Sequence, residues 1–600
     1  MSKKREEFDN IYKWKITDLY KNDAEAKKEL KNIIKDSKML LKYKGHILDS
    51  DSSLYNLLEL DKNISMRLER AYTYAHLNND ADTTNPKYQE LYGIARNTYA
   101  EYLASSSFIV PELLQKDYEI VKKYIKINKN LKAYQRNLRE IFRNKKHVLN
   151  DEVENVLSSL ANIISSPDEI MGTITDSDFK FDNIIVDGKN VELTESNFSV
   201  YLRHPNQDVR KQAFTNLYKT YGNFKNTLAV ILKNEIEKNV QIAKLRNYNS
   251  SLERSLFALE INKNVYTNLI ISVHHNLSSL YKYWDLKKKL LNLDEFHIYD
   301  SYAEIETNNN QKYSFKDAQE LVLKAVEPLG KQYVEDISKA FSENWIDSCN
   351  NEGKRGGAYC TACYNVHPYV LMSFEGLLND VSTLAHELGH AMHYYYACKY
   401  QNYQDYNYSI FVAEVASQVN EILLCRYLLD HSNSNIEKTR ITDDLLQKYK
   451  STIYRQTMFA EFELYLHKYT EKGQVLTGEI MCNKYIELNK LYFGNNVIID
   501  DDIKYEWERI PHFYMNFYVW MYATGFAAAV KLANEIYEGN IETRDKYLKF
   551  LKLGSTKNPI DSLKVAGIDM TNETVMNDAI KFMNELIKNY EMLQGSDIDE

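Results

Sequence analysis

The sequence predicts a mainly α-helical protein built from more than one domain. The chain has 600 residues, which is too long for one compact core. It holds only 8 Pro and 19 Gly, well below the usual shares of about 5% and 7%. Chains that seldom interrupt their helices have this composition, and long charged segments repeat apolar residues at helical spacing. These observations together predict two or three mostly helical domains or lobes.

The first 110 residues are expected to form an N-terminal helical lobe without evident chemistry. Residues 24–43 and 61–76 are charged amphipathic runs, and Pro86 lies in an expected loop. The basic N-terminus has no apolar stretch behind it, so we expect no signal peptide and a cytoplasmic protein. No run approaches 18 apolar residues, so no membrane span is predicted.

The next segment, 111–200, is expected to be helical with one β-hairpin. Pro111 opens a helical stretch that continues to Lys146. Residues 179–193 form two alternating runs around Asp187-Gly188, a dipeptide that favours a two-residue hairpin turn. We therefore place a domain boundary near residue 200.

Residues 201–590 are expected to form one large helical domain, and 591–600 an acidic tail. The expected helices that precede its motifs cover residues 208–221, 227–246, 263–291 and 316–344, with a polar loop at 300–315. The net charge is −9 with both signs interleaved, so no basic stripe suggests nucleic acid. Six Cys in this length form no disulfide framework, and the lone pair Cys360 and Cys363 is expected to be structural or redox-silent.

The segment 380–396, DVSTLAHELGHAMHYYY, is expected to be a helix that carries the chemistry. His386 and His390 are four residues apart and share one face, the separation at which two imidazoles reach one tetrahedral Zn²⁺. Glu387 lies beside His386, where it can touch a water without binding the metal. The pattern His-Glu-x-x-His is typical of zinc peptidases, although roughly a few per cent of chains this long contain it by chance.

A second helix, expected at 409–429, offers the third ligand. Glu414, Gln418 and Glu421 form a polar stripe on an otherwise apolar helix, and a carboxylate buried there needs a partner. Glu414, 24 residues after His390, is the best third ligand. Glu421 either accepts the other ring N–H of a metal-binding His or is an ordinary solvated carboxylate. A metzincin site is excluded because Tyr396 stands where its third His would be needed.

Residues 508–522, ERIPHFYMNFYVWMY, are expected to begin a further helix with a proline in its first turn. Tyr514, Tyr518 and Tyr522 recur every four residues on one face, and His512 precedes them. Such a stripe is either part of an aromatic core or a set of donors aimed at a developing oxyanion. The metal helix makes us favour the catalytic role.

An irregular region, 353–374, precedes the metal helix and contains an expected strand at 366–373. Pro368 inside this strand argues for an edge strand, whose free N–H and C=O groups could pair with an extended peptide. The alternative is that the strand only supports the helix. The expected substrate-binding residues are Gly356, Gly357, Val366, His367 and Tyr369.

Three motifs in a fixed order resemble one known family, the oligoendopeptidase F group of the thimet-type (M3) zinc metallopeptidases. They are VHPYVLMSFEGLLNDVSTLAHELGHAMH, YSIFVAEVASQVNEILL and RIPHFYMNFYVWMYATG, and weaker similarity spans nearly the whole chain. The resemblance implies a two-lobed, multi-helix zincin-type fold with a deep central substrate channel. It also implies a small β element beside the active-site helix and one Zn²⁺ per chain.

The resemblance further implies roles for particular residues. The implied zinc ligands are His386, His390 and Glu414, the implied catalytic glutamate is Glu387, and the implied electrophiles are among His512, Tyr514, Tyr518 and Tyr522. An oligopeptidase F N-terminal-like segment is implied at 111–200 and an M3-like catalytic domain at 201–590. The implied activity is the cleavage of internal bonds in short unstructured peptides by a monomer or small homo-oligomer.

Two other functions compete with this interpretation. A zinc carboxypeptidase or dipeptidyl carboxypeptidase would need a cation for the terminal carboxylate of its substrate, and Arg355 or Arg509 could supply it. A helical scaffold with a structural metal would need a fourth protein ligand, and none is evident in the sequence.

Overall fold

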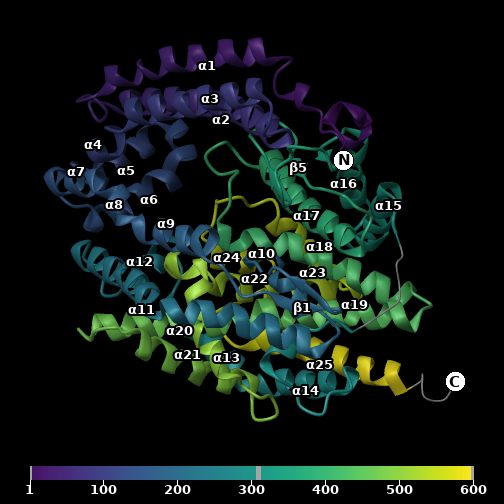
Figure 1. Ribbon diagram of the computed structural model, residues 1–600. Helices are drawn as coiled ribbons and strands as arrows, with labels where there is room; N and C mark the ends of the chain where they lie inside the picture. Colours follow the sequence, from purple (N-terminus) through teal and green to yellow (C-terminus); the bar gives the residue numbers. More distant parts are fainter. Residues whose placement is uncertain (1–2, 306–311, 596–600) are drawn as a thin grey trace. The chain divides into compact units, whose positions relative to one another are not determined.

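The computed structural model describes residues 3–305 and 312–595, and it is mainly helical, which confirms the predicted fold class (Figure 1). The chain forms two compact units. Unit 1 comprises Met1–Lys146, Gln311–Tyr427 and Leu532–Gly567, and unit 2 comprises the remaining stretches, His147–Asn310, Leu428–Lys531 and Ile568–Glu600. No helix of the described residues is both long and apolar enough to cross a membrane.

The two units are interleaved along the chain, whereas the segments expected from the sequence are consecutive. Each unit combines stretches that are far apart in sequence but packed together in space. The domain boundaries expected at residues 110 and 200 therefore remain a proposal: they divide the chain by the motifs that each segment carries. Half of the expected acidic tail, 596–600, lies outside the described residues, and α25 (Thr574–Gly595) precedes it.

Unit 1 begins with three helices that pack side by side, α1 (Asp23–Ser37), α2 (Asp51–Ala81) and α3 (Pro86–Ser106) (Figure 1). Asn85 caps α3 by accepting the N–H of Lys87, and Pro86 is its first residue. The expected loop at Pro86 is therefore wrong, because proline suits the first turn, where its missing N–H is not needed.

Short helices complete this N-terminal part of unit 1. They are η1 (Arg5–Glu7), η2 (Asn10–Tyr12), η3 (Ile16–Asp18), η4 (Leu40–Tyr43), α4 (Ile109–Leu114), α5 (Tyr118–Ile127), η5 (Lys129–Tyr134), α6 (Gln135–Arg143) and η6 (Asn144–His147). The apolar core of the N-terminal helices also takes in Tyr369 and Leu371. The N-terminal helices and the segment before the metal helix therefore share one core.

The rest of unit 1 carries the predicted metal helix and a small sheet. Its elements are α15 (Phe315–Ala325), η9 (Glu327–Leu329), α16 (Lys331–Ser342), β3 (Ile346–Asp347), β4 (Tyr359–Thr361), β5 (Tyr369–Leu371), α17 (Leu378–Tyr400), α18 (Ile410–His431), α23 (Ile541–Phe550) and α24 (Pro559–Val565). The helix expected at 316–344 is divided, since Pro328 and the left-handed Gly330, with a φ of 95°, separate α15 from α16.

The three-stranded sheet has the order β3-β5-β4, with β3 parallel and β4 antiparallel to β5. Both β4 and β5 contact α17, so this sheet is the β element expected beside the metal helix. The prediction that 366–373 is an edge strand is wrong, because β5 is the central strand. Pro368 precedes β5 and lies outside its paired residues; the edge strands are β3 and β4.

Unit 2 is organised around α11 (Gln207–Leu245), a single helix where two were expected. Gly222 does not end the first of them; its missing side chain leaves room for Tyr505, whose ring would lie 2.7 Å from an added Cβ. The predicted hairpin is confirmed as β1 (Ile184–Val186) paired with β2 (Lys189–Val191). Its Asp187 and Gly188 have φ values of 49° and 75°, as a type I′ turn requires.

The other helices of unit 2 precede or follow α11 along the chain. They are α7 (Asp151–Ser159), α8 (Ala161–Ile164), α9 (Ser166–Thr173), η7 (Ile174–Asp178), α10 (Glu195–Leu202), α12 (Ser251–Ala258), α13 (Lys263–His275), α14 (Leu277–Leu290), η8 (Ile298–Tyr302), α19 (Asn435–Lys448), η10 (Tyr449–Tyr454), α20 (Arg455–Glu471), α21 (Gly478–Phe493), η11 (Asp501–Arg509), η12 (Pro511–Tyr514) and the start of α22 (Trp520–Tyr537). The helix expected at 263–291 breaks at Asn276. The polar loop expected at 300–315 includes residues 306–311, which lie outside the described part of the chain.

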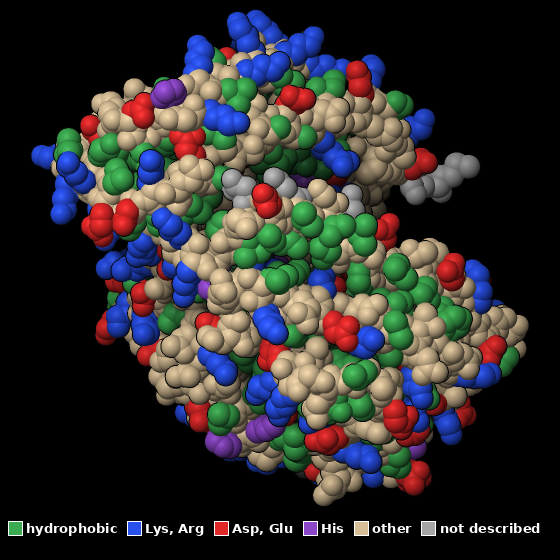
Figure 2. Space-filling view, turned by 90° about the vertical axis from the view of Figure 1, so that its left-hand side faces the viewer, with side chains coloured by type: hydrophobic (Ala, Val, Ile, Leu, Met, Phe, Trp, Pro, Cys, Tyr) green, Lys and Arg blue, Asp and Glu red, His purple; other side chains and the backbone are tan. Residues whose placement is uncertain are grey.

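Acidic and basic side chains are interspersed over most of the face drawn in Figure 2. This distribution agrees with the interleaved charges of the sequence.

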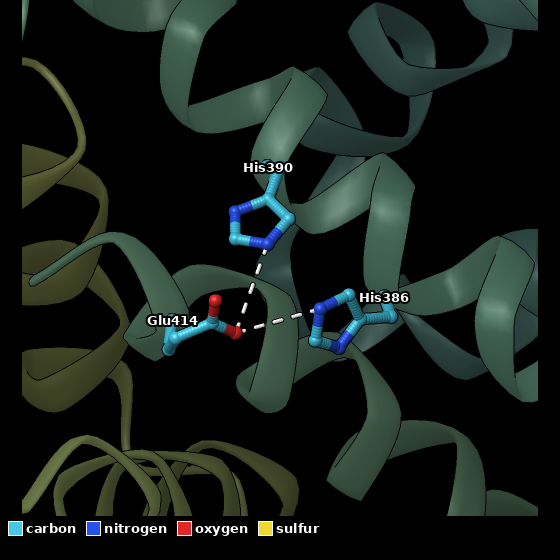
Figure 3. A group of neighbouring side chains, drawn as sticks. All are labelled: His386, His390 and Glu414. Atoms are coloured by element: carbon cyan, nitrogen blue, oxygen red, sulfur yellow. Dashed lines mark ion pairs between the residues drawn. The ribbon is translucent and has the colours of Figure 1, made fainter. Parts of the chain in front are cut away.

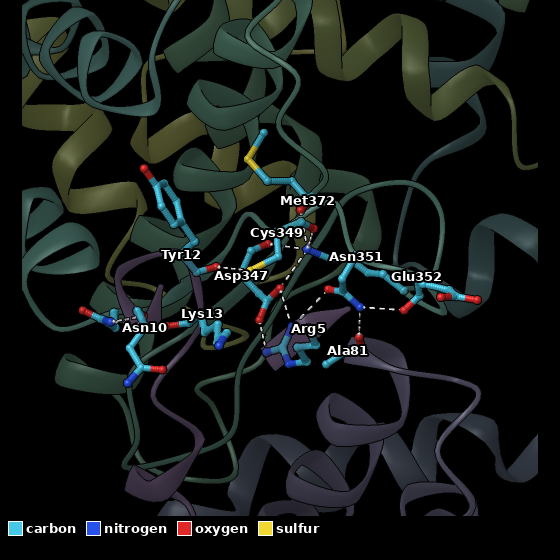
Figure 4. A network of polar contacts seen from close by, with 12 residues as sticks. Arg5, Asn10, Tyr12, Lys13, Ala81, Asp347, Cys349, Asn351, Glu352 and Met372 are labelled. Carbon is cyan, nitrogen blue, oxygen red and sulfur yellow. Dashed lines mark hydrogen bonds and ion pairs between the residues drawn. The ribbon is translucent and has the colours of Figure 1, made fainter. Parts of the chain in front are cut away.

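A buried ionic network joins the N-terminus to the small sheet of unit 1 (Figure 4). The guanidinium of Arg5 donates to both carboxylate oxygens of Asp347, which is fully buried at the end of β3. Lys354 Nζ donates to Asp347 Oδ1 at 2.8 Å and to the carbonyls of Cys349 and Met372, each at 2.6 Å. One carboxylate thus faces two cations.

The Asp347 carboxylate is the charge that makes this network stable. Burial alone would raise the pKa of Asp347, but the hydrogen bonds and charges of Arg5 and Lys354 lower it below its usual value. A lowered carboxylate pKa adds stability above the unfolded-state value of about 3.9, and that stability is lost as the pH falls through the folded-state pKa.

We expect Asp347→Ala to destabilise unit 1 by about 3–5 kcal/mol, because it leaves the buried ammonium of Lys354 and the partly buried guanidinium of Arg5 without a counter-charge. Urea and thermal unfolding followed by circular dichroism would measure the loss. The control is Glu90→Ala, which removes the exposed partner of Lys27 and should change stability by no more than about 1 kcal/mol. Equal effects of the two substitutions would contradict this role of Asp347.

Candidate active site

The metal helix forms as the sequence predicted and extends beyond it at both ends, over Leu378–Tyr400. Asp380 Oδ2 accepts the N–H groups of Glu375 and Leu377, each at 2.9 Å, and so satisfies donors at the helix start. The apolar stripe is buried as predicted, with Leu384 and Leu388 fully inaccessible. The opposite, partly exposed face carries the two histidines.

The next helix, α18, touches α17 backbone to backbone at Gly389. A Cβ added to Gly389 would lie 2.5 Å from both the carbonyl oxygen of Ala416 and the Cα of Ser417. Only glycine allows this approach, which brings Glu414, one turn earlier in α18, to the histidines. Asn420 supports the same crossing, since its Nδ2 donates to the carbonyl of Ala385 at 3.3 Å.

The side chains of His386, His390 and Glu414 converge on one point (Figure 3). Glu414 Oε2 lies 3.5 Å from His386 Nε2 and 3.7 Å from His390 Nε2, and the three ligand atoms are all within 4.8 Å of one another. Ligands bound tetrahedrally at about 2.0–2.1 Å lie about 3.4 Å apart. The three donors are therefore spaced as one metal ion requires.

Outer contacts orient both imidazoles. His386 Nδ1 lies 3.3 Å from Glu421 Oε2, and Ser382 Oγ donates to the other oxygen of Glu421 at 2.9 Å. The ring of His390 is hydrogen-bonded to the backbone of Ala413. In both cases one ring nitrogen is engaged by the protein, so the nitrogen that faces Glu414 keeps its lone pair for a metal.

The electrostatics of the two histidines differ. Burial and, after it, the charge of His386 lower the pKa of His390 to about 3, so His390 is neutral. Burial also opposes charge on His386, but the hydrogen bond and charge of Glu421 outweigh it and raise its pKa. A bound cation would oppose that protonation and favour the neutral imidazole.

Glu387 is buried beside the three ligands and has an oxygen available. Among the described residues, its Oε2 has no hydrogen-bond partner. Burial and the nearby Glu414 and Glu421 raise its pKa to about 7, against the opposing effect of His386. A carboxylate with a pKa near neutrality can both accept and return a proton, and a bound cation would lower this pKa.

The expected substrate-binding residues do not form one surface. Tyr369 is fully buried against Trp14, and His367 stacks on Trp345, with Nε2 3.2 Å from Asp18 Oδ2. Val366 packs against the core of the N-terminal helices. These three side chains pack within unit 1, and β5 contacts α17, as the alternative of a strand that supports the metal helix expects; their role in substrate binding stays a prediction.

Gly356 and Gly357 differ from those three residues because they are exposed in the turn that precedes β4. Their binding role stays a prediction. Cys360 on β4 is close enough to Glu387 for the carboxylate to raise the pKa of its thiol, together with burial. The edge strand β4 therefore passes beside the metal helix.

The expected aromatic donors lie in unit 2, and they do not share one helix. His512 and Tyr514 belong to η12, whereas Tyr518 precedes α22 and Tyr522 lies in its first turn. The rings of Tyr518 and Tyr522 are 5.3 Å apart, and His512 lies 6.3 Å and 6.1 Å from them. The prediction of one continuous tyrosine stripe is wrong, since a non-helical segment, 515–519, separates Tyr514 from α22.

Sequence reasoning missed three residues that build the site, Ser382, Gly389 and Asn420. The two polar residues gave no signal, because Ser and Asn are common on helix surfaces. Gly389 did give one: glycine inside a helix costs about 1 kcal/mol relative to alanine, which indicates a packing reason.

Two adjacent helices that present His-Glu-x-x-His and a further glutamate define the site of a metallopeptidase. Comparison with known proteins agrees. The family model described as "Peptidase family M3" matches residues 200–582, and the one described as "Oligopeptidase F" matches 112–181. The chain belongs to peptidase family M3, in its oligoendopeptidase F group, and is a metalloendopeptidase.

Individual relatives cover nearly the whole chain. Oligopeptidase PepF of Bacillus subtilis is 38% identical over 97% of this chain and 87% of its own length. Group B oligopeptidase PepB of Streptococcus agalactiae is 35% identical over 99% of both chains. The crystal structure of oligoendopeptidase F from Enterococcus faecium has a TM-score of 0.74 at 32% identity and covers 95% of this chain and 98% of its own.

We expect Gly389→Ala to lower the affinity for a metal ion and the peptidase activity together, because the new methyl group forces α18 and Glu414 away from the histidines. Overpacking of this kind typically costs about 1–3 kcal/mol of stability. The matched control is Gly93→Ala in α3, where an added Cβ meets no atom within 4 Å and stability should rise by about 0.5–1 kcal/mol. Metal analysis and thermal unfolding check both variants; a Gly389→Ala protein with the same metal content as wild type would contradict the role of the crossing.

Proposed function

We propose that this metalloendopeptidase uses one Zn²⁺ to hydrolyse internal bonds of short, unstructured peptides. The observation that carries the proposal is the convergence of His386, His390 and Glu414. Two imidazoles and one carboxylate suit zinc. Among the described residues the group has three members, which fits a catalytic site with a position for water better than a closed structural site.

A zinc ion held by these three residues would polarise the scissile carbonyl and lower the pKa of a water to about 7. Glu387 would accept the proton of that water as it attacks and then pass the proton to the leaving amine. Glu421 would keep His386 in the orientation and tautomer that metal binding needs. Donors from His512, Tyr518 and Tyr522 would stabilise the oxyanion.

We further propose that the substrate backbone pairs with β4. Val370 and Met372 donate their N–H groups to Trp345 and Asp347, so these β5 residues face β3. Tyr369 and Leu371 therefore face β4, and Cys360, which lies opposite Val370, directs its N–H and C=O away from the sheet. Among the described strands β4 has a neighbour on one side only, and an extended peptide could add there.

The carboxypeptidase alternative is disfavoured by how its candidate cations are bound. Arg355 Nη1 is 3.3 Å from Asp80 Oδ2, and Arg509 is paired with Glu195 through both Nε and Nη2. Each guanidinium already has a carboxylate partner within its own unit. A carboxypeptidase would need one of them to hold the terminal carboxylate of its substrate.

We expect the enzyme to cut a peptide of roughly 6 to 20 residues at internal bonds, since a short extended chain can pair with an edge strand. A flexible full-length protein such as casein should be cut far more slowly than a short peptide taken from it. Mass spectrometry of both digests, with and without chelator, checks this. Release of single C-terminal residues would favour the carboxypeptidase, and equal rates on the two substrates would contradict the preference for short peptides.

We expect Glu387→Gln to lower kcat by at least about 10²–10⁴-fold while one zinc per chain stays bound, because the side chain moves protons and does not bind the metal. Glu414→Ala should instead lose zinc, since it leaves a two-histidine site. Metal analysis beside peptide hydrolysis separates these outcomes. Zinc loss in Glu387→Gln, or normal zinc content in Glu414→Ala, would overturn the corresponding assignment.

A further inference from the structure

A strained turn separates η12 from α22 in unit 2. Asn516 and Phe517 are consecutive residues with φ values of 48° and 61°, in the left-handed region. A single asparagine is tolerated there, but a bulky aromatic residue is a rare exception. Strain of this kind destabilises the chain locally and persists only where surrounding contacts enforce it.

Polar contacts from three elements hold this turn. Glu463 in α20 accepts the backbone N–H of Phe517 through Oε1 at 2.6 Å. The indole of Trp520 donates to the carbonyl of Phe517 at 2.9 Å. Ser255 Oγ in α12 donates to the carbonyl of Asn516 at 3.2 Å. The backbone groups that a left-handed turn leaves without helical partners are thus satisfied by side chains.

Apolar packing fixes the turn as well. The ring of Phe517 is 1% exposed. It lies 4.4 Å from the ring of His467 and 5.8 Å, edge-on, from that of Tyr266. The aromatic side chain thus stabilises the turn through burial, while its backbone angle carries the strain.

A glutamate is unusual at a buried position such as 463, because burial disfavours its charged form. Its side chain is fully buried, and among the described residues Oε2 has no hydrogen-bond partner. Burial raises its pKa to about 8, although the Phe517 N–H opposes this, so the carboxyl is neutral at pH 7. A buried acid without a charged partner costs stability, which suggests that the group serves something other than stability.

The turn decides which aromatic residues lie together. In a continuous helix Tyr514, Tyr518 and Tyr522 would share one face. The turn instead separates Tyr514 and gathers Tyr518 and Tyr522 with His512, at the ring distances given above. A change in the angles of Asn516 or Phe517 would move Tyr518 directly, because it is the next residue in the chain.

We infer that Glu463 is a positioning residue: by accepting the Phe517 N–H it holds the left-handed turn and so fixes Tyr518 and Tyr522 beside His512. The inference rests on the proposed function, in which these side chains stabilise the oxyanion. It assigns Glu463 no contact with the substrate.

The first test compares two substitutions of Glu463. Glu463→Leu removes the acceptor, and kcat should fall by about 10- to 100-fold, the loss expected when donors are displaced by about 1 Å. KM should change by less than about twofold, and zinc content should stay the same. Glu463→Gln is the matched control, because its amide oxygen can still accept the N–H, and it should retain most of the activity. Equal activity of Glu463→Leu and wild type, or equal losses in both variants, would overturn the inference.

A rescue experiment distinguishes positioning from a general loss of stability. Glycine adopts positive φ without cost, so Asn516→Gly should restore part of the lost kcat in the Glu463→Leu background. Asn516→Gly alone should stay close to wild type. No recovery in the double variant would count against the proposed role of the turn. Ser255→Ala, which removes the hydrogen bond to Asn516, gives a second and smaller fall in kcat if the leucine variant does not fold.

Hydrogen exchange gives a readout independent of activity. In Glu463→Leu the peptide covering residues 511–522 should exchange faster than in wild type, and in Glu463→Gln it should not. Unchanged protection in the leucine variant would overturn the inference. Tyr518→Phe and Tyr522→Phe test the proposed function separately: if both keep wild-type kcat, the oxyanion role is wrong even where exchange shows that Glu463 holds the turn.

Discussion

The contact on which the candidate metal centre depends is the backbone approach of α17 and α18 at Gly389. Its missing side chain lets the carbonyl of Ala416 and the Cα of Ser417 reach a distance that any other residue would prevent. Histidines four residues apart on α17 provide two ligands through local helical geometry alone. The third ligand, Glu414, arrives only because the second helix can come this close. The candidate metal site is thus a property of the crossing of two helices, and not of one motif.

The sequence was most informative where chemistry and local geometry coincide. His386, His390 and Glu387 lie within five residues, so helical periodicity alone places them together. Glu414 followed from the cost of burying a lone carboxylate, and the hairpin at Asp187-Gly188 from the angles its turn requires. Helix boundaries were less predictable: Gly222 lies inside α11 because Tyr505, distant in sequence, fills the space beside it.

The two errors near the site have the same physical origin. Pro368 is compatible with the central strand because β5 starts one residue later, which hydrogen bonds to β3 and β4 decide. The tyrosine repeat is helical in spacing, yet Glu463, Ser255 and Trp520 impose a turn upon it. In both cases tertiary partners override a valid local pattern, and no pattern within the segment itself reveals those partners.

The ionic network at Asp347 also constrains the order in which unit 1 can form during synthesis, because it joins residues far apart in the chain. Arg5 and Asp347 are separated by 342 positions. During synthesis Arg5 can therefore form this ion pair only after the middle of the chain has been made. The loop between α17 and α18 completes its contacts later still, because the carbonyl of Asp405 accepts the N–H of Ser555. Such high contact order delays folding. A ribosome-bound chain would therefore present its histidine motif before unit 1 is complete, because this unit includes residues up to Gly567.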